Sequence, residues 1–220
     1  MRLNKYIASA TGLSRRAGDE AIRQNRVLVN NFPPSSGQQI SVGDTVTLDG
    51  TTLTPVSTTI TIMLNKPAGY VCSREGQGSR TIYDLLPDEL HHLKPVGRLD
   101  KDTGGLLLMT NDGNLAQQLT HPSYEKIKVY DVRIDPALAP LHRQMISDHG
   151  IQLSDGTSKL QVDRLIDGDD TAWQITMHEG RNRQIRRTFE SLGYVVEELQ
   201  RIAMGEYKLD GLKRGTYKES

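Results

Sequence analysis

The sequence predicts an α+β protein made of two domains. Two segments with helical spacing of apolar residues open the chain, and short strand-like segments follow them. From residue 60 onward, strand-like segments dominate, which favours a large, mostly antiparallel sheet. Residues 54–59 form a polar stretch containing Pro55, which is typical of a linker. We therefore expect a small αβ domain at residues 1–56 and a larger domain at residues 60–220.

The first domain is expected to pack two helices on a small sheet. The first helix is indicated by an apolar face at positions i, i+3, i+4 and i+7, which comprises Leu3, Tyr6, Ile7 and Ala10, with Gly12 ending the helix. Ser14 is well placed to cap a second helix, whose inward side would carry Ala17, Ala21 and Ile22. Strand-like segments at 27–30 and, after a proline-containing loop, at 42–50 complete the domain.

The second domain alternates strands with a few short helices. Strands are predicted at residues 60–64, 70–73, 106–109, 126–134, 151–154, 158–166, 172–178, 195–199 and 206–209. Helices are predicted at 81–86, 115–119, 140–149 and 182–192. The last helix would turn Ile185, Phe189 and Leu192 inward and end at Gly193.

Composition excludes several classes of protein. The 220 residues carry no formal net charge, so the overall charge does not indicate a nucleic-acid partner. The single cysteine, Cys72, excludes an internal disulfide and a Cys-rich zinc site. No apolar leader follows Leu3, and no run approaches the roughly 18 apolar residues of a membrane span. We expect a soluble cytoplasmic protein without a membrane partner.

The stretch at residues 97–113 carries the most chemistry. Leu106, Leu107, Leu108 and Met109 form an apolar run that suits a strand buried on both faces, and residues 111–113 would close it as a turn. The preceding loop holds Arg98, Asp100, Asp102 and the pair Gly104–Gly105, whose backbone freedom lets a ligand come close. An acid presented on a glycine-rich loop against a rigid strand is one arrangement of a catalytic group. The alternative is a surface turn with solvated aspartates.

Positive charge gathers in two places. Residues 1–30 hold six basic side chains (Arg2, Lys5, Arg15, Arg16, Arg23 and Arg26) against the two acids Asp19 and Glu20. A second run holds Arg181, Arg183, Arg186 and Arg187. Such groups bind phosphates without reading sequence, although a merely solvated helix face would look the same.

Three motifs in order now identify a family. These are Leu64-Asn65-Lys66-Pro67-Ala68-Gly69, then Gly97-Arg98-Leu99-Asp100 with Thr103-x-Gly105-Leu106-Leu107, then Glu179-Gly180-Arg181-Asn182-Arg183-Gln184-Ile185-Arg186-Arg187. Together they closely resemble the signatures of the RsuA-type ribosomal RNA pseudouridine synthases. The first domain is similar to the RNA-binding module of ribosomal protein S4, on Arg2-Leu3-Asn4-Lys5-Tyr6-Ile7, Ser14-Arg15-Arg16, Arg26-Val27-Leu28-Val29-Asn30 and Gly43-Asp44.

The resemblance implies site-specific isomerisation of uridine to pseudouridine in ribosomal RNA. Asp100 would be the nucleophile or base acting on a flipped-out uridine, and Arg186 would keep it ionised. Tyr130 would stack on the uracil and Leu199 would line the pocket. No cofactor is needed because no oxidation or group transfer occurs. No metal site is expected, because the histidines lack metal-ligand spacing with Cys72.

The remaining assignments concern the partner. RNA contacts are expected from Arg2, Lys5, Arg15, Arg16, Arg26, Lys66, Arg98, Arg181, Arg183 and Arg187. The partner would be 16S or 23S ribosomal RNA, or a ribosomal assembly intermediate, bound by a monomer. Motif details favour both small-subunit and large-subunit members, so the RNA stays open. Two alternatives are a non-catalytic RNA-binding assembly factor and a synthase directed at tRNA.

Overall fold

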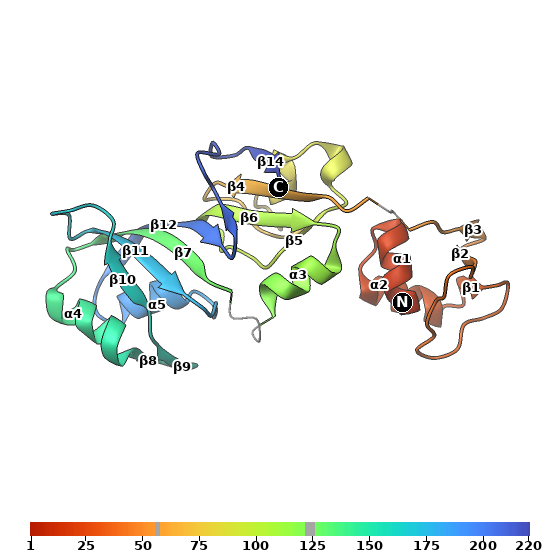
Figure 1. Cartoon of the computed structure of the whole chain (residues 1–220), viewed down its shortest axis with the longest axis horizontal. Helices are drawn as coiled ribbons and strands as arrows, with labels where there is room; N and C mark the ends of the chain where they lie inside the picture. Colours follow the sequence, from red (N-terminus) through yellow and green to blue (C-terminus); the bar gives the residue numbers. More distant parts are fainter. Residues whose placement is uncertain (56–57, 122–125) are drawn as a thin grey trace. The chain divides into compact units, whose positions relative to one another are not determined.

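The chain divides into two compact units, Met1–Thr59 and Ile60–Ser220 (Figure 1). The structure is a computed structural model, and it describes residues 1–55, 58–121 and 126–220. Residues 56 and 57, which fall in the predicted linker, lie outside the described residues.

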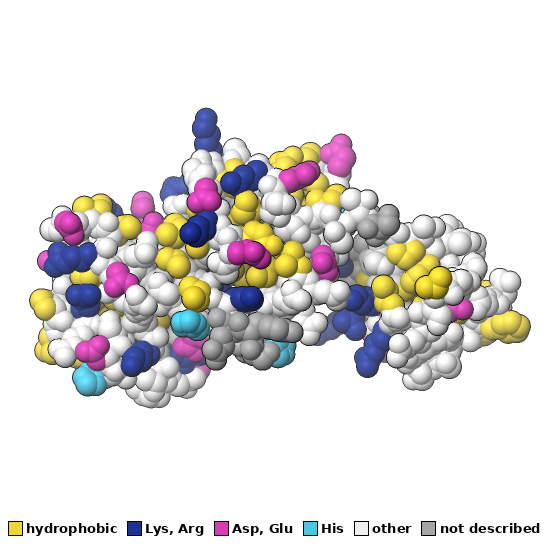
Figure 2. All heavy atoms as spheres, in the orientation of Figure 1, with side chains coloured by type: hydrophobic (Ala, Val, Ile, Leu, Met, Phe, Trp, Pro, Cys, Tyr) yellow, Lys and Arg dark blue, Asp and Glu magenta, His cyan; other side chains and the backbone are white. Residues whose placement is uncertain are grey.

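The N-terminal unit packs helices α1 (Leu3–Thr11) and α2 (Arg15–Arg23) with a sheet of β1 (Val27–Val29), β2 (Val46–Leu48) and β3 (Thr51–Thr52). Both predicted helices are confirmed: Gly12 follows α1 at φ 74°, and the Ser14 hydroxyl accepts the Ala17 N–H at 3.0 Å. The core of this unit comprises Leu3, Ile7, Ala21, Val27, Val29, Ile40, Val46 and Leu53. Figure 2 shows Lys and Arg side chains at the edge of this unit where Figure 1 draws α2.

The second unit is built on one nine-stranded sheet. Its main order is β10 (Gln161–Arg164), β11 (Ala172–Met177), β7 (Lys128–Asp135), β12 (Val195–Met204), β6 (Gly104–Thr110), β4 (Thr61–Lys66) and β14 (Tyr217–Glu219). In addition, β5 (Lys94–Pro95) pairs with β6, and β13 (Tyr207–Lys208) pairs with β12. Among the described strands, β12 and β6 form the one parallel pair, so the predicted α+β class with a mostly antiparallel sheet is confirmed.

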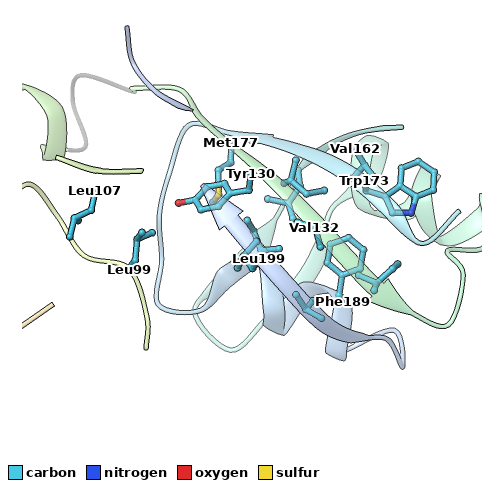
Figure 3. Close-up of a cluster of buried hydrophobic side chains, with 14 of the residues drawn as sticks. Leu99, Leu107, Tyr130, Val132, Val162, Trp173, Met177, Phe189 and Leu199 are labelled. Atoms are coloured by element: carbon cyan, nitrogen blue, oxygen red, sulfur yellow. The ribbon is translucent and has the colours of Figure 1, made fainter. Parts of the chain in front are cut away.

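Strand β6 lies in the middle of the hydrophobic core, with every residue buried. Leu107 and Met109 belong to the larger core cluster on one face, while Leu106 and Leu108 belong to a second cluster on the other. The alternation follows from the two-residue period of a strand. Figure 3 shows part of the larger cluster, with Leu99 and Leu107 near one end and Trp173 near the other.

Short helices complete the second unit. They are the 3₁₀ helices η1 (Ile82–Leu85) and η2 (Asp88–Leu90), then α3 (Gly113–Thr120), α4 (Pro140–Gln144), its continuation η4 (Met145–His149), and α5 (Gln184–Glu190). On and beside α5, Ile185 and Phe189 are buried and Leu192 packs against them, as predicted. In the part of the chain that the structure describes, no helix is long and apolar enough to cross a membrane.

Four predictions about local structure are wrong. Residues 70–73 form no strand but one bridge, from Val71 to Thr81, because their only ladder-like hydrogen bonds in the described residues join Val71 to Arg80 and Ile82. The strand predicted at 158–166 is split: β9 (Gly156–Ser158) pairs with β8 (Ile151–Leu153) in a separate hairpin, and only β10 joins the large sheet. Residues 111–113 do not close a turn, since the Asp112 carboxylate caps α3 by accepting the Asn114 N–H at 2.8 Å. Strands β3, β5 and β14 were not predicted.

Candidate active site

A cavity of about 580 Å³ lies in the second unit. Its wall comes from the loop before β6, the end of α3, strands β7 and β12, and the segment between β11 and α5. It brings together Asp100, Tyr130, Leu199, Arg98, Arg181 and Arg183, which were predicted as site residues. The volume is in the range of small-molecule and cofactor sites, roughly 300–1,000 Å³.

Lys66, at the end of β4, anchors the loop that carries Asp100. The Lys66 side chain is fully buried, and its ammonium donates to the carbonyls of Pro67, Asp100, Lys101 and Thr103, at 3.1, 3.1, 3.4 and 2.7 Å. Burial lowers the pKa of this lysine, while the carboxylates of Asp102 and Asp100 oppose that shift. The sequence left two roles open for Lys66, support of the site or contact with RNA. Because no part of its side chain reaches solvent, the structure favours support of the site, and the Lys66 ammonium offers no contact to RNA here.

Asp100 itself is half-buried at the cavity wall. Its backbone carbonyl accepts the Thr103 N–H at 3.1 Å, which closes a tight turn. Among the described residues, its carboxylate makes no hydrogen bond or ion pair within 4.0 Å. The carboxylate is thus held on a fixed backbone and left available to a ligand.

Arg186 pairs with a different acid from the one expected. Its guanidinium donates to the carbonyls of Val196 at 2.7 Å and Asp102 at 3.0 Å, and Nε lies 3.2 Å from Asp102 Oδ2. The side chain is 6 % exposed and does not line the cavity. The predicted ion pair between Arg186 and Asp100 is therefore absent from the described contacts. The turn after Asp100 directs Asp102 toward α5 instead.

Tyr130 and Leu199 lie on one face of the sheet. Tyr130 is on β7 and Leu199 on the neighbouring β12, and both are about nine-tenths buried and line the cavity. Figure 3 shows the Tyr130 ring beside Met177, with its hydroxyl directed away from Val132 and toward the side on which Leu99 lies. The sheet therefore presents an aromatic ring and an apolar side chain to the same space as Asp100.

The glycine pair serves strand packing rather than ligand approach. Gly105 has φ +103°, and a Cβ there would lie 2.2 Å from the carbonyl oxygen of Arg201. At Gly104 a Cβ would lie 3.2 Å from the Lys66 carbonyl. Strand β12 comes this close because it pairs with β6 at these two glycines. The expected ligand contact is replaced by a neighbouring strand.

The arginine run at 181–187 is engaged inside the protein. Arg181 and Arg187 both pair with Asp155, at 3.0 and 2.8 Å, which ties the cavity segment to the β8–β9 hairpin. Arg183 donates to both oxygens of Asp102 at 3.0 Å, and this hydrogen bond raises the pKa of Arg183. A phosphate contact by any of these three would have to replace or share an existing carboxylate. Arg98 is exposed at the rim of the cavity.

Comparison with known proteins identifies the family. The sequence model described as RNA pseudouridylate synthase matches residues 60–191. The chain belongs to this family. The chain is 34 % identical to the ribosomal large subunit pseudouridine synthase B of Bacillus subtilis, over 99 % of this chain and 91 % of that protein. It is 36 % identical to the ribosomal small subunit pseudouridine synthase A of Pasteurella multocida, over 99 % and 95 %. A crystal structure of a pseudouridylate synthase superposes with a TM-score of 0.71 at 33 % identity, over 100 % of this chain and 96 % of that one.

The N-terminal unit of this pseudouridine synthase carries the remaining predicted contacts. Arg2, Arg15 and Arg16 are exposed, and Lys5 is half-buried. Arg26 forms an ion pair of 2.5 Å with Asp49, a carboxylate that the sequence did not place beside it. A phosphate would therefore compete with Asp49 for Arg26, whereas Arg2, Arg15 and Arg16 present their side chains to solvent.

Several side chains around the synthase's cavity were not predicted from the sequence. Arg201 on β12 and Lys128 on β7 both line it, and Asp102 and Asp155 organise the arginines behind it. One signal was available: Arg201 follows Leu199 by two residues, and strand alternation puts such residues on one face. No sequence signal pairs Asp155 with Arg187, because Asp155 lies in the turn of the β8–β9 hairpin and Arg187 lies on helix α5.

Proposed function

We propose that this synthase isomerises a specific uridine in ribosomal RNA, with the Asp100 carboxylate acting on the ribose of a flipped-out nucleotide. The observation that carries the proposal is Asp100 at the cavity: its carboxylate is unpaired among the described residues, and its backbone carbonyl accepts a hydrogen bond from the buried ammonium of Lys66. The relatives from Bacillus subtilis and Pasteurella multocida, named as a large-subunit and a small-subunit pseudouridine synthase, support ribosomal RNA as the substrate class.

The chemistry follows from the groups around the cavity. The N1–C1′ bond breaks, and positive charge develops at C1′, as in glycoside hydrolysis. The Asp100 carboxylate either bonds to C1′ or removes the C2′ proton. After the base turns, C5 bonds to C1′, the C5 proton leaves and N1 gains a proton, so atoms and electrons balance without a cofactor. Tyr130, which lines the cavity, would stack on the base and assist the departure of the C5 proton.

The N-terminal unit is proposed to anchor the RNA. Arg2, Arg15 and Arg16 are exposed cations, and such groups supply affinity through phosphates. The target uridine would then be extruded from the folded RNA into the cavity.

The test is tritium release from RNA labelled with 5-³H-uridine. Unmodified small-subunit RNA, large-subunit RNA and tRNA are each incubated with the synthase. The proposal expects release from one ribosomal RNA. Release from tRNA alone would favour the tRNA-directed alternative, and tight ribosomal RNA binding without release from any of them would favour the non-catalytic assembly factor.

A further inference from the structure

Arg201 is a buried cation at the cavity without a carboxylate partner. Its side chain is 2 % exposed and lines the cavity from β12. Nε donates to the Leu106 carbonyl at 2.8 Å, while Nη2 makes no hydrogen bond. No carboxylate lies within ion-pair distance of Arg201 in the described residues. Because removing a charge from water is costly unless an opposite charge or hydrogen bonds compensate, this guanidinium is set up for a ligand.

The other arginines near the cavity differ in this respect. Arg181 pairs with Asp155, and both Arg183 and Arg186 pair with Asp102. Arg98 is exposed at the rim, where a backbone phosphate would pass. Arg201 therefore combines burial, a place in the cavity wall and an unfilled donor.

The position of Arg201 is next to the residues proposed to hold the base. Arg201 stands opposite Tyr130 in the register between β12 and β7, and it follows Leu199 by two residues on the same face. Lys128, two residues before Tyr130, also lines the cavity, and both burial and the charge of Arg201 lower the pKa of Lys128. Two cations thus lie beside the proposed base site, below the rim where phosphates would bind.

Negative charge develops on the base during the proposed reaction. When the N1–C1′ bond breaks, its electron pair stays on the uracil and spreads from N1 to the oxygens O2 and O4. Donors fixed where charge develops in the transition state lower the barrier more than donors that bind the ground state equally well.

We propose that Arg201 is a catalytic residue that stabilises the detached uracil anion, by donating from its guanidinium to a uracil oxygen, with Lys128 adding positive charge. This inference rests on the proposed function. The anion loses its charge when its electron pair forms the C5–C1′ bond. The base then loses the proton on C5 and gains one on N1. Arg201 therefore neither gives nor takes a proton in these steps.

The test compares two bases in the same RNA. 5-Fluorouracil is a better leaving anion than uracil because fluorine withdraws electrons, so it depends less on Arg201. With saturating enzyme, single-turnover consumption of the starting nucleoside at the target position is measured by nuclease digestion and liquid chromatography coupled to mass spectrometry. The chromatographic step separates uridine from pseudouridine, which has the same mass. Arg201→Met should slow uridine consumption on the order of 100-fold and 5-fluorouridine consumption on the order of 10-fold or less. Arg201→Lys, which keeps the charge and the fold, should also slow uridine consumption more than 5-fluorouridine consumption, with a smaller effect on both.

The control variants distinguish a catalytic Arg201 from a structural or phosphate-binding one. Arg214→Met removes an exposed arginine that donates to Gln200, and it should slow neither base. Equal slowing of both bases by Arg201→Met and Arg201→Lys would overturn the inference in favour of a structural role. Weaker RNA binding with unchanged single-turnover rates would overturn it in favour of a phosphate contact. If Asp100→Asn consumed uridine like the wild type, the proposed function itself would fail, which is a separate result.

Discussion

Asp102 Oδ2 lies 3.2 Å from Nε of Arg186, so the buried arginine of this synthase is neutralised by the acid two residues after the one at the cavity. The same carboxylate accepts two contacts from Arg183. Asp102 therefore joins the Asp100 loop to the start of α5. The Asp100 carboxylate, in contrast, makes no hydrogen bond or ion pair with any residue that the structure describes, and Asp100 lines the cavity.

Replacing Asp102 tests this link. Asp102→Asn keeps the shape of the side chain but leaves Arg186, which is 5 % exposed, without a carboxylate. Because the Asp102 side chain is 46 % exposed, water screens part of the effect, and we expect a loss of about 1–2 kcal/mol in the free energy of unfolding. Urea denaturation measures it, with the exposed Asp167→Asn as the matched control. Equal stability of the two variants would show that the pair contributes nothing.

Removing the Lys66 ammonium should loosen the loop that holds Asp100. Lys66→Met fills similar space but removes the ammonium that donates to four carbonyls. The carbonyls of Asp100 and Lys101 keep the backbone N–H groups of Thr103 and Gly69 as donors, so the loss falls mainly on the carbonyls of Pro67 and Thr103. Leaving buried acceptors unsatisfied costs roughly 1–3 kcal/mol each at most, and partial relaxation makes a total of about 2–4 kcal/mol our expectation. The change is read as a lower midpoint in thermal unfolding together with a lower rate of tritium release. A variant with wild-type stability and rate would contradict the anchoring role.

Gly105 should tolerate no side chain. Gly105→Ala places a Cβ 2.2 Å from a backbone oxygen of β12 at φ +103°, so we expect a loss of about 3 kcal/mol or more, by backbone strain and strand separation. Gly113→Ala is the matched control, since nothing lies within 4 Å of its Cβ and it opens helix α3. There the expected change is zero or a gain of about 0.5–1 kcal/mol. Similar melting temperatures for the two variants would rule out the close strand approach.

The N-terminal unit should account for part of the salt dependence of RNA binding. Arg15→Ala combined with Arg16→Ala removes two exposed cations. The slope of log K against log salt concentration should become shallower by roughly 0.7–0.9 per lost phosphate contact. The exposed pair Lys213→Ala with Arg214→Ala, in the other unit, serves as the control. If both double variants left the slope unchanged, these helix arginines would not be the anchor.

Local patterns made much of the fold predictable, because the physical cause is contained within a few residues. The apolar run at Leu106–Met109 suited a strand buried on both faces, which β6 is. Ser14 could cap a helix because its hydroxyl is three residues from the Ala17 N–H. The strand predicted at residues 70–73 was wrong because side chains that favour strands do not by themselves supply a neighbouring strand to pair with. Strand β4 pairs with β6 on one side, and the strand on its other side, β14, comes from the other end of the chain.

The candidate site was predictable in its cavity residues and not in its ion pairs. Asp100, Tyr130 and Leu199 meet at one cavity, as the motifs implied. Which carboxylate neutralises Arg186 depends on how one turn directs two side chains, Asp100 and Asp102, and spacing cannot decide that. The same holds for Asp155, whose role follows from the position of a hairpin that the sequence had suggested as part of a longer strand.

The most direct test of the central role of Asp100 compares Asp100→Asn with the wild type on the ribosomal RNA that releases tritium. The variant keeps the size of the side chain and the backbone contacts that hold the loop, so RNA affinity should stay within a few-fold. Tritium release should be abolished, since an amide neither bonds to C1′ as a carboxylate does nor removes a C2′ proton. Release at the wild-type rate would contradict a catalytic Asp100, and loss of RNA binding instead of turnover would make Asp100 a structural residue.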